Sequence, residues 1–265
     1  MSDAPVFIGA LAAAFFQISA ATSGAFNQPK GEGLLIAGGS AVQGDFTFGA
    51  NGKLAKTPPY RKGEFSLYLE YGVTDRLTVL ARPAAETVSV GAPTRANISG
   101  LGDSQAGLQI KLFTYGEAVF ALRATAIAPG HPGSRSAAAV GHTAGAAQGD
   151  LVAGYAFSLF SWPTFIEGSA GYRRRAGRYD PEWRADETFG LRPRPDILLL
   201  LKASSVLAAH YEGPALNGTY AMKAQAGLVY DLNAHWSVEA GGFATLIGRN
   251  ALRERGVTAA VWRRF

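Results

Sequence analysis

The chain has 265 residues, no cysteine, 33 glycines, a charged fraction of 17% and a formal net charge of +5. Without cysteine it has no disulfide framework, no cysteine-based zinc cluster and no cysteine nucleophile. It also lacks a run of about 18 to 20 apolar residues that could cross a bilayer as a helix. The net charge is compatible with an anionic membrane surface or with nucleic acid, and it specifies neither.

The N-terminus carries an apolar run from Val6 to Ala20, followed by the small residues Ser23, Gly24 and Ala25. A run of this length before small residues is typical of a secretory signal peptide. We therefore expect residues 1–25 to be an export signal and residues 26–265 to form the mature domain. The alternative is a buried N-terminal helix, because "MSDAP" lacks the basic residues that usually begin a signal.

From Phe26 onward the apolar residues recur with a period of two, which indicates β-strands. The segment from Tyr220 to Tyr230 shows the pattern, with Met222 and Leu228 on one face and Lys223 on the other. Most of the predicted strands reach about ten residues, the length that a tilted strand needs to cross a bilayer. We predict twelve strands, at 33–45, 64–73, 76–90, 103–114, 117–128, 148–159, 163–174, 185–193, 196–210, 218–231, 234–247 and 256–265.

The predicted connections alternate between short and long. Short turns fall near 73–76, 114–116, 160–163, 192–196 and 231–235, and long connections at 46–63, 91–102, 129–147, 174–185, 211–218 and 248–255. Short periplasmic turns and longer extracellular loops are typical of outer-membrane barrels. A propeller is less compatible, because each period holds two long strands rather than four short ones. We predict an all-β fold, a single twelve-stranded antiparallel transmembrane barrel, with ten or fourteen strands as alternatives.

Two of the short turns share a sequence pattern. "YGVTDRLTV" at 71–79 and "YDLNAHWSV" at 230–238 both place an aromatic residue, a turn and a valine at matching positions. We expect the same hairpin at both places, on the periplasmic side. Aromatic residues gather at this end of the predicted barrel, where amphipathic rings would lie at a membrane interface. The predicted interface aromatics are Tyr71, Trp162, Tyr230, Trp236 and Trp262.

The last ten residues, "GVTAAVWRRF", place Val257, Ala259 and Val261 in phase with the terminal Phe265. This segment resembles the C-terminal strand of Gram-negative outer-membrane β-barrels, whose terminal aromatic residue is part of the signal read by the barrel assembly machinery. The segments "YLEYGVTDRLTVLARP", "SGLGDSQAGLQIKLF" and "DETFGLRPRPDILLLL" also look like a poorly characterised group of small porin-like or transporter-type barrels. The resemblance implies an outer-membrane location and an assembly role for Phe265.

If the apolar face of each strand contacts lipid, the charged side chains on the opposite face point into the lumen. Buried charges need water or partners. With water, an excess of Lys and Arg would make a passive channel for small polar or anionic solutes; with pairing, salt bridges would plug a structural or surface-interaction barrel. The predicted lumen residues are Glu70, Arg82, Lys111, Arg123, Glu167, Lys202, Lys223 and Glu239.

Basic residues also lie in or beside the predicted long loops, where they would meet the phosphates of lipopolysaccharide. The alternative is ordinary solvated loop charge. The expected partners are therefore outer-membrane lipid, lipopolysaccharide, the assembly machinery and small solutes, without nucleic acid. The residues predicted to face lipopolysaccharide are Arg61, Lys62, Arg174, Arg175 and Arg178.

Catalytic motifs give little support for an enzyme, and we predict no cofactor and no metal site. The chain has no G-x-S-x-G motif of the kind that carries a serine nucleophile. The glycine-rich segment 100–105 is interpreted as the start of a β-strand rather than as a dinucleotide-binding loop. The histidines show no metal-ligand spacing. One enzymatic hypothesis remains, a lipid-acting site at the outer rim, because one long loop contains His131, Ser134, Ser136 and His142.

Overall fold

The computed structural model describes residues 24–93, 95–130, 138, 140–177, 179–208, 211–212, 215–216 and 218–265. The predicted signal peptide therefore lies almost entirely outside the described residues. Within them the structure is all-β and contains no helix. Its strands are β1 (Gly33–Phe48), β2 (Leu54–Gly72), β3 (Leu77–Arg82), β4 (Ala84–Val90), β5 (Ala96–Leu101), β6 (Ser104–Tyr115), β7 (Ala118–Ala128), β8 (Ala146–Leu159), β9 (Trp162–Arg175), β10 (Glu182–Arg194), β11 (Ile197–Ala208), β12 (Tyr211–Glu212), β13 (Ala215–Leu216), β14 (Thr219–Asp231), β15 (Trp236–Arg249) and β16 (Ala251–Arg264).

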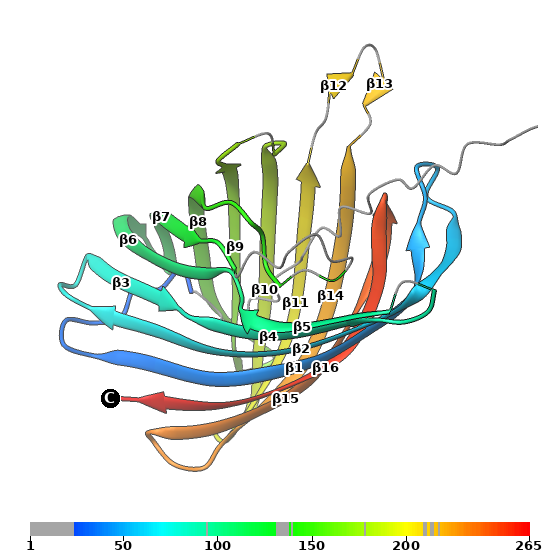
Figure 1. Cartoon of the computed structure of the whole chain (residues 1–265). Helices are drawn as coiled ribbons and strands as arrows, with labels where there is room; N and C mark the ends of the chain where they lie inside the picture. The colour runs from blue at the N-terminus through cyan, green and yellow to red at the C-terminus, as the bar shows by residue number, and fades with distance from the viewer. Residues whose placement is uncertain are drawn as a thin grey trace, which may run out of the picture.

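The strands form one antiparallel sheet that closes on itself, because β1 pairs with both β16 and β2 (Figure 1). Two of the barrel strands are each interrupted and therefore consist of two consecutive segments. Strands β3 and β4 both pair with β2 and are separated only by Pro83, which has no N–H for the ladder. Strands β5 and β6 are likewise separated by two residues. The described residues thus make a twelve-stranded barrel, as predicted, with β12 and β13 as a separate small hairpin.

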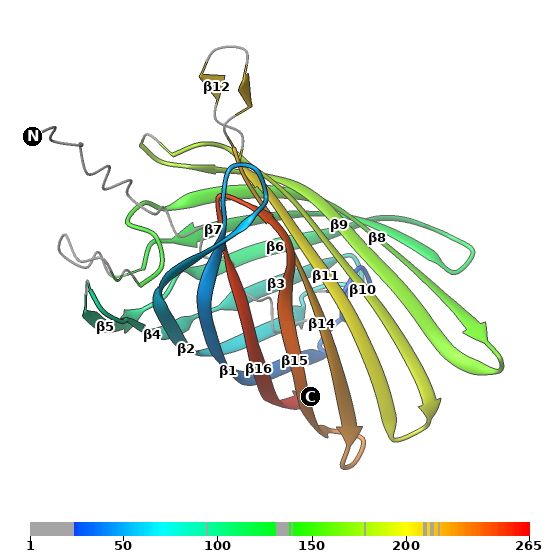
Figure 2. The same ribbon diagram turned by 90° about the vertical axis from the view of Figure 1, so that its right-hand side faces the viewer.

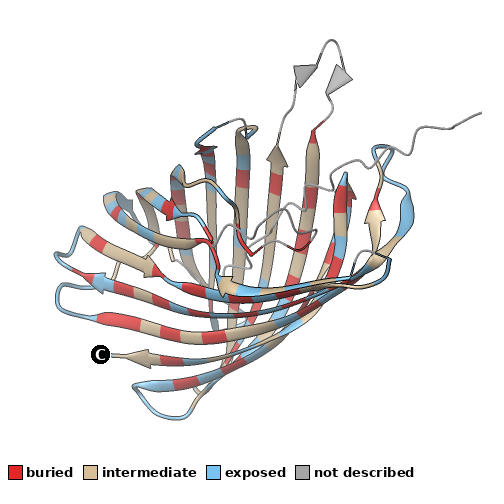
Figure 3. Cartoon of the chain, in the orientation of Figure 1, coloured by how far each residue is buried: buried red, intermediate tan, exposed pale blue. Residues whose placement is uncertain are grey.

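Buried and more exposed residues alternate along the strands of the barrel wall (Figure 3). On β2, Tyr68 and Glu70 are buried on the inner face, whereas Phe65 and Leu67 are exposed on the outer face. Large apolar side chains such as Leu201, 56% exposed, cover the outside, and charged side chains are buried inside. This arrangement is the reverse of that in a water-soluble protein and suits a barrel surrounded by lipid.

The two turns with matching sequences adopt the same hairpin, as predicted. The backbone N–H of Val73 donates to Leu77 O at 2.9 Å, and that of Leu232 donates to Trp236 O at 2.9 Å. A side-chain oxygen completes each turn, since Thr74 Oγ1 accepts from Leu77 N and Asn233 Oδ1 accepts from Trp236 N, each at 3.0 Å. The C-terminus lies at this short-turn end, opposite the β12–β13 hairpin (Figure 2).

At the opposite end, three predicted long loops are wrong. The ranges 46–63 and 248–255 are mostly strand, because β2 begins at Leu54 and β16 begins at Ala251, and half of 91–102 is strand β5. The chain reverses tightly there, with positive φ angles of 74° at Gly52 and 50° at Asn250. The alternation of apolar residues ends where the outer face becomes polar. Backbone hydrogen bonding between the strands continues past that point.

The described residues of the 129–145 loop lie toward the inner wall. They include Ala138 and Val140, which are buried against Tyr60 of β2 and Val88 of β4. This described part of the loop therefore lies against the inside of the barrel at the long-loop end.

Residues 24–32, hereafter the N-terminal segment, enter the barrel at the short-turn end. Gln109 Nε2 donates to Gly24 O at 3.0 Å, and Gln28 Nε2 donates to Glu70 Oε2 at 2.8 Å. Ala25 is completely buried against the inner wall. The segment therefore occupies part of the lumen and narrows it.

Trp262 does not lie at the membrane interface, contrary to the prediction. It is 5% exposed, packs in an inner cluster with Ile36 and Leu200, and donates from Nε1 to Glu239 Oε2 at 3.1 Å. The reason is strand parity, because an even-numbered residue of β16 faces inward when Val261 faces outward.

Trp262→Ala is expected to lower the free energy of unfolding by about 3–5 kcal/mol, because it leaves a cavity in the inner cluster. Trp236→Ala removes the same side chain from the rim, where it is 42% exposed, and should cost clearly less. Urea unfolding of the barrel in lipid vesicles, followed by heat-modifiable gel mobility, measures both. Equal losses for the two variants would contradict the inward placement of Trp262.

Candidate functional site

The barrel wall surrounds a hydrophilic cavity that is partly open to solvent. Inward-facing positions of several neighbouring strands supply its charged lining. Six basic side chains and three acidic ones face this space: Arg82, Arg123, Arg173, Arg184, Lys202 and Lys223, with Asp150, Glu167 and Asp186.

The structure places the eight predicted lumen residues on the inner wall. Glu70, Arg82, Lys223 and Glu239 are buried, and Arg123, Glu167 and Lys202 line the cavity in half-buried positions. Lys111 pairs with the inward-facing Ala121 and lies outside the cavity lining. Their role in solute selectivity stays a prediction.

Sequence reasoning missed seven acidic residues of the inner wall, so the predicted excess of cations over the whole lumen is wrong. Some of them lie beyond the predicted strand ends, and others follow the inward parity of predicted strands, which would have found them. The seven residues are Glu64, Glu86, Asp103, Asp150, Glu182, Asp186 and Glu254.

Buried ion pairs connect neighbouring strands near the long-loop end. Lys62 Nζ lies 3.0 Å from Glu64 Oε2 and 3.0 Å from Glu86 Oε1, and Arg82 pairs with Glu64. Lys62 was predicted to face lipopolysaccharide, and the structure contradicts this. Strand β2 extends to Leu54, so Lys62 keeps the inward parity of Glu64.

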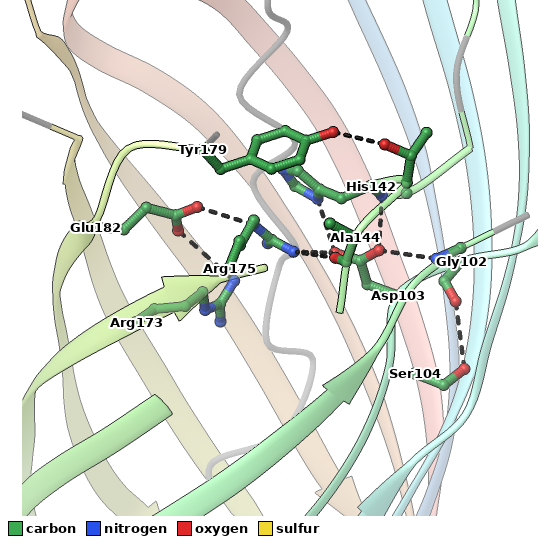
Figure 4. Close-up of polar contacts among 12 residues, drawn as sticks. Gly102, Asp103, Ser104, His142, Ala144, Arg173, Arg175, Tyr179 and Glu182 are labelled. Atoms are coloured by element: carbon green, nitrogen blue, oxygen red, sulfur yellow. Dashed lines mark hydrogen bonds and ion pairs between the residues drawn. The ribbon is translucent and has the colours of Figure 1, made fainter. Parts of the chain in front are cut away.

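A second set of ion pairs, the Asp103 cluster, comprises Asp103, His142, Arg175 and Glu182 (Figure 4). Asp103 is completely buried where β5 meets β6. Its carboxylate accepts from the backbone N–H of His142 at 2.7 Å and of Gly130 at 3.1 Å. His142 Nδ1 lies 2.8 Å from Asp103 Oδ2, and Arg175 Nη1 lies 3.3 Å from it. The cluster attaches the 129–145 loop to the wall.

Arg175 was also predicted to face lipopolysaccharide, and it instead is 2% exposed on the inner wall. Strand β9 continues to Arg175, which therefore keeps the inward parity of Arg173. Its Nε lies 3.1 Å from Glu182 Oε1, so the guanidinium joins two carboxylates of different strands. The burial of this charge is offset by both partners.

The other predicted outward-facing residues that the structure describes lie on the outer face, as the alternation along their strands requires. Arg61 and Arg174 are exposed, and Arg178 lies outside the described residues. The remaining predicted aromatics are exposed at the short-turn end: Tyr71, Trp162, Tyr230 and Trp236. Phe265 pairs with Gly33 through a backbone hydrogen bond of 2.7 Å from Gly33 N, while its assembly role stays a prediction.

The hypothetical rim enzyme cannot be assembled from the described residues, because His131, Ser134 and Ser136 lie outside them. Ser104, which is near the Asp103 cluster, hydrogen-bonds the backbone at Gly102 O and Ala84 N. In the part of the chain that the structure describes, no group of three Asp, Glu or His side chains is placed to hold a metal ion. No helix of that part is long and apolar enough to span a membrane.

No protein-family model matches the chain, and no curated protein matches it. Solved structures do. An outer membrane channel from Pseudomonas putida F1 is 17% identical, with a TM-score of 0.73 over 92% of this chain and 98% of that one. The translocator domain of the autotransporter NalP from Neisseria meningitidis is 13% identical, with a TM-score of 0.54 over 91% of each chain.

The porin NanC is 10% identical, with a TM-score of 0.51 over 86% of this chain and 98% of that one. At these identities the similarity concerns the fold. It agrees with the closed sheet, the apolar exterior and the charged interior described above. The chain therefore has the fold of an outer-membrane β-barrel.

Proposed function

We propose that the protein is a narrow passive channel of the outer membrane for small polar solutes, with a preference for anions. The observation that carries the proposal is the hydrophilic cavity inside a closed barrel whose exterior is apolar. The similarity to an outer membrane channel and to a porin supports it.

The anion preference depends on the cavity rather than on the whole lumen. Among the charged side chains that face it, basic residues outnumber acidic ones by six to three. Charges around a confined, low-dielectric path attract solutes of opposite sign and raise their local concentration. Arg123 and Lys202 face this cavity from β7 and β11, which are separated by three strands of the sheet.

Two elements narrow the passage. The N-terminal segment occupies the lumen at the short-turn end, and the 129–145 loop lies against the wall at the other end. Movement of either element would change the width of the passage. A channel of this kind is expected to conduct weakly and to fluctuate between levels.

The second candidate function is a structural or surface-interaction barrel whose lumen is closed by salt bridges. The buried pairs favour it, including Lys223 with Glu254 and Lys202 with Glu239 at 3.5 Å. The cavity favours the channel, because it leaves charged groups facing open space. We infer no catalytic role, and a lipid-acting enzyme would require a phospholipid-cleaving activity that is lost in His131→Ala or His142→Ala.

Replacing cavity cations should reduce the anion preference. Arg123→Gln and Lys202→Gln each remove one positive charge from the lining, so the anion-to-cation permeability ratio is expected to fall by about twofold. Reversal potentials in a salt gradient across a planar bilayer measure the ratio. Arg174→Gln, which removes an exposed outer charge, is the control and should leave the ratio unchanged. A barrel that is silent in every salt would exclude the channel.

Asp103→Asn should loosen the 129–145 loop. The change leaves Arg175 without one of its two carboxylates and weakens the acceptor for two backbone N–H groups. Breaking a buried ion pair costs about 3 kcal/mol, so amide exchange at 140–145 is expected to accelerate by about 100-fold, with larger conductance fluctuations. Asp45→Asn changes an exposed carboxylate and serves as control. Unchanged exchange in the Asp103 variant would show that the cluster does not hold the loop.

A further inference from the structure

The outer face of the barrel carries a cationic patch, defined here as Arg61, Arg253 and Arg255, near the long-loop end. Strand register brings the side chains together. Gln43 of β1 pairs with Arg255 of β16 on one side and with Arg61 of β2 on the other. The next outward row pairs Phe46 with Arg253 and with Lys56. Paired residues of neighbouring strands share a face, so these cations lie side by side.

The patch has no counter-charge of its own. Among the described residues, no carboxylate forms an ion pair with any of its three arginines, and all three are exposed. Asp45 lies in the bulge of the same β1 strand, and it too forms no ion pair in this part of the chain. This contrasts with the inner wall, where Arg175 and Arg82 each contact carboxylates.

The patch lies immediately above the apolar exterior. On β2 the outward residues below Arg61 are Phe65 and Leu67, and on β16 those below Arg255 are Val257 and Val261, all of them exposed. Lys and Arg on the lipid face are costly at the bilayer midplane and tolerated near the interface. Longer loops are typical of the extracellular end of outer-membrane barrels, and this orientation places the patch level with the headgroups of the outer leaflet.

A shallow groove leads from the apolar surface to the patch. Small outward residues leave room along its floor, and nothing lies within 4 Å of the position that a Cβ would take at Gly63. Polar groups flank the groove, with Arg61 and Gln43 beside the hydroxyl of Ser89. Its floor continues across Ala41 of β1 to Val257 of β16. The groove thus combines an apolar floor with an upper end that is polar and cationic.

We propose that this groove and patch bind lipopolysaccharide, with a lipid A phosphate held by Arg61 and Arg255 and an acyl chain lying over Gly63 and Ala41. The guanidinium group donates two parallel hydrogen bonds to phosphate oxygens, which makes arginine well suited to this ligand. The ligand is a phosphorylated glycolipid rather than free phosphate, because the cations adjoin an apolar groove. The site is on the outer face, so it is independent of conduction through the lumen.

The test is lipopolysaccharide binding by the purified full barrel in detergent, measured by native mass spectrometry. Arg61→Ala/Arg255→Ala is expected to weaken binding by at least about tenfold, the effect of losing charge-assisted hydrogen bonds to phosphate. Arg76→Ala/Arg194→Ala removes two exposed arginines at the opposite end and should bind as the wild type does. Gel mobility with and without heating confirms that each variant is folded.

Two further arms separate the phosphate from the lipid. Gly63→Leu keeps every charge and fills the groove from its open side, so it is also expected to weaken binding. Dephosphorylated lipid A should bind less than lipid A, and millimolar inorganic phosphate should not compete. Wild-type binding by the Arg61/Arg255 variant, or full competition by inorganic phosphate, would overturn the proposal. Neither result would bear on conductance, which all these outer-face variants should retain.

Discussion

In the hydrocarbon part of a bilayer, every backbone N–H and C=O group must find its partner within the protein. The sheet meets this requirement by closing, with β1 hydrogen-bonded to both β16 and β2. Closure has a second consequence, because it fixes which face of each strand meets lipid. From one known residue, such as the exposed Leu67, the face of every neighbour on that strand follows by parity until a bulge interrupts it.

Inward parity brings charged side chains into a confined space, where each needs a partner or water. The inner wall supplies both kinds of environment. Lys62 contacts two carboxylates from different strands, and Arg175 does the same within the Asp103 cluster. The pairs around Lys62 join β2 to β3 and β4, and the Asp103 cluster joins the β5–β6 junction to β9, β10 and His142. The cavity between them keeps a surplus of basic groups, which is what a selective passage requires.

The alternating pattern was sufficient to predict all twelve barrel strands, the repeated hairpin and the inward direction of residues such as Glu70. It was not sufficient for the strand ends, because apolar alternation stops at the membrane boundary while hydrogen bonding continues. Lys62 and Arg175 were misplaced for that reason. The Asp103 cluster could not be predicted, since it joins residues from β5–β6, β9, β10 and a distant loop. Only the closed sheet brings these segments together.

Arg174 and Arg175 show how completely one position decides the chemistry of a side chain. They are consecutive and identical, yet Arg175 is buried between two carboxylates and Arg174 is exposed on the outside. The charge of Arg175 is neutralised by two carboxylates within the protein, and the side chain thereby helps to hold the Asp103 cluster together. An arginine on the outer face must instead be matched by solvent or by the membrane. Three adjacent outward arginines therefore favour the binding of an external anion. At the level of the outer leaflet, the phosphate groups of lipids can supply it.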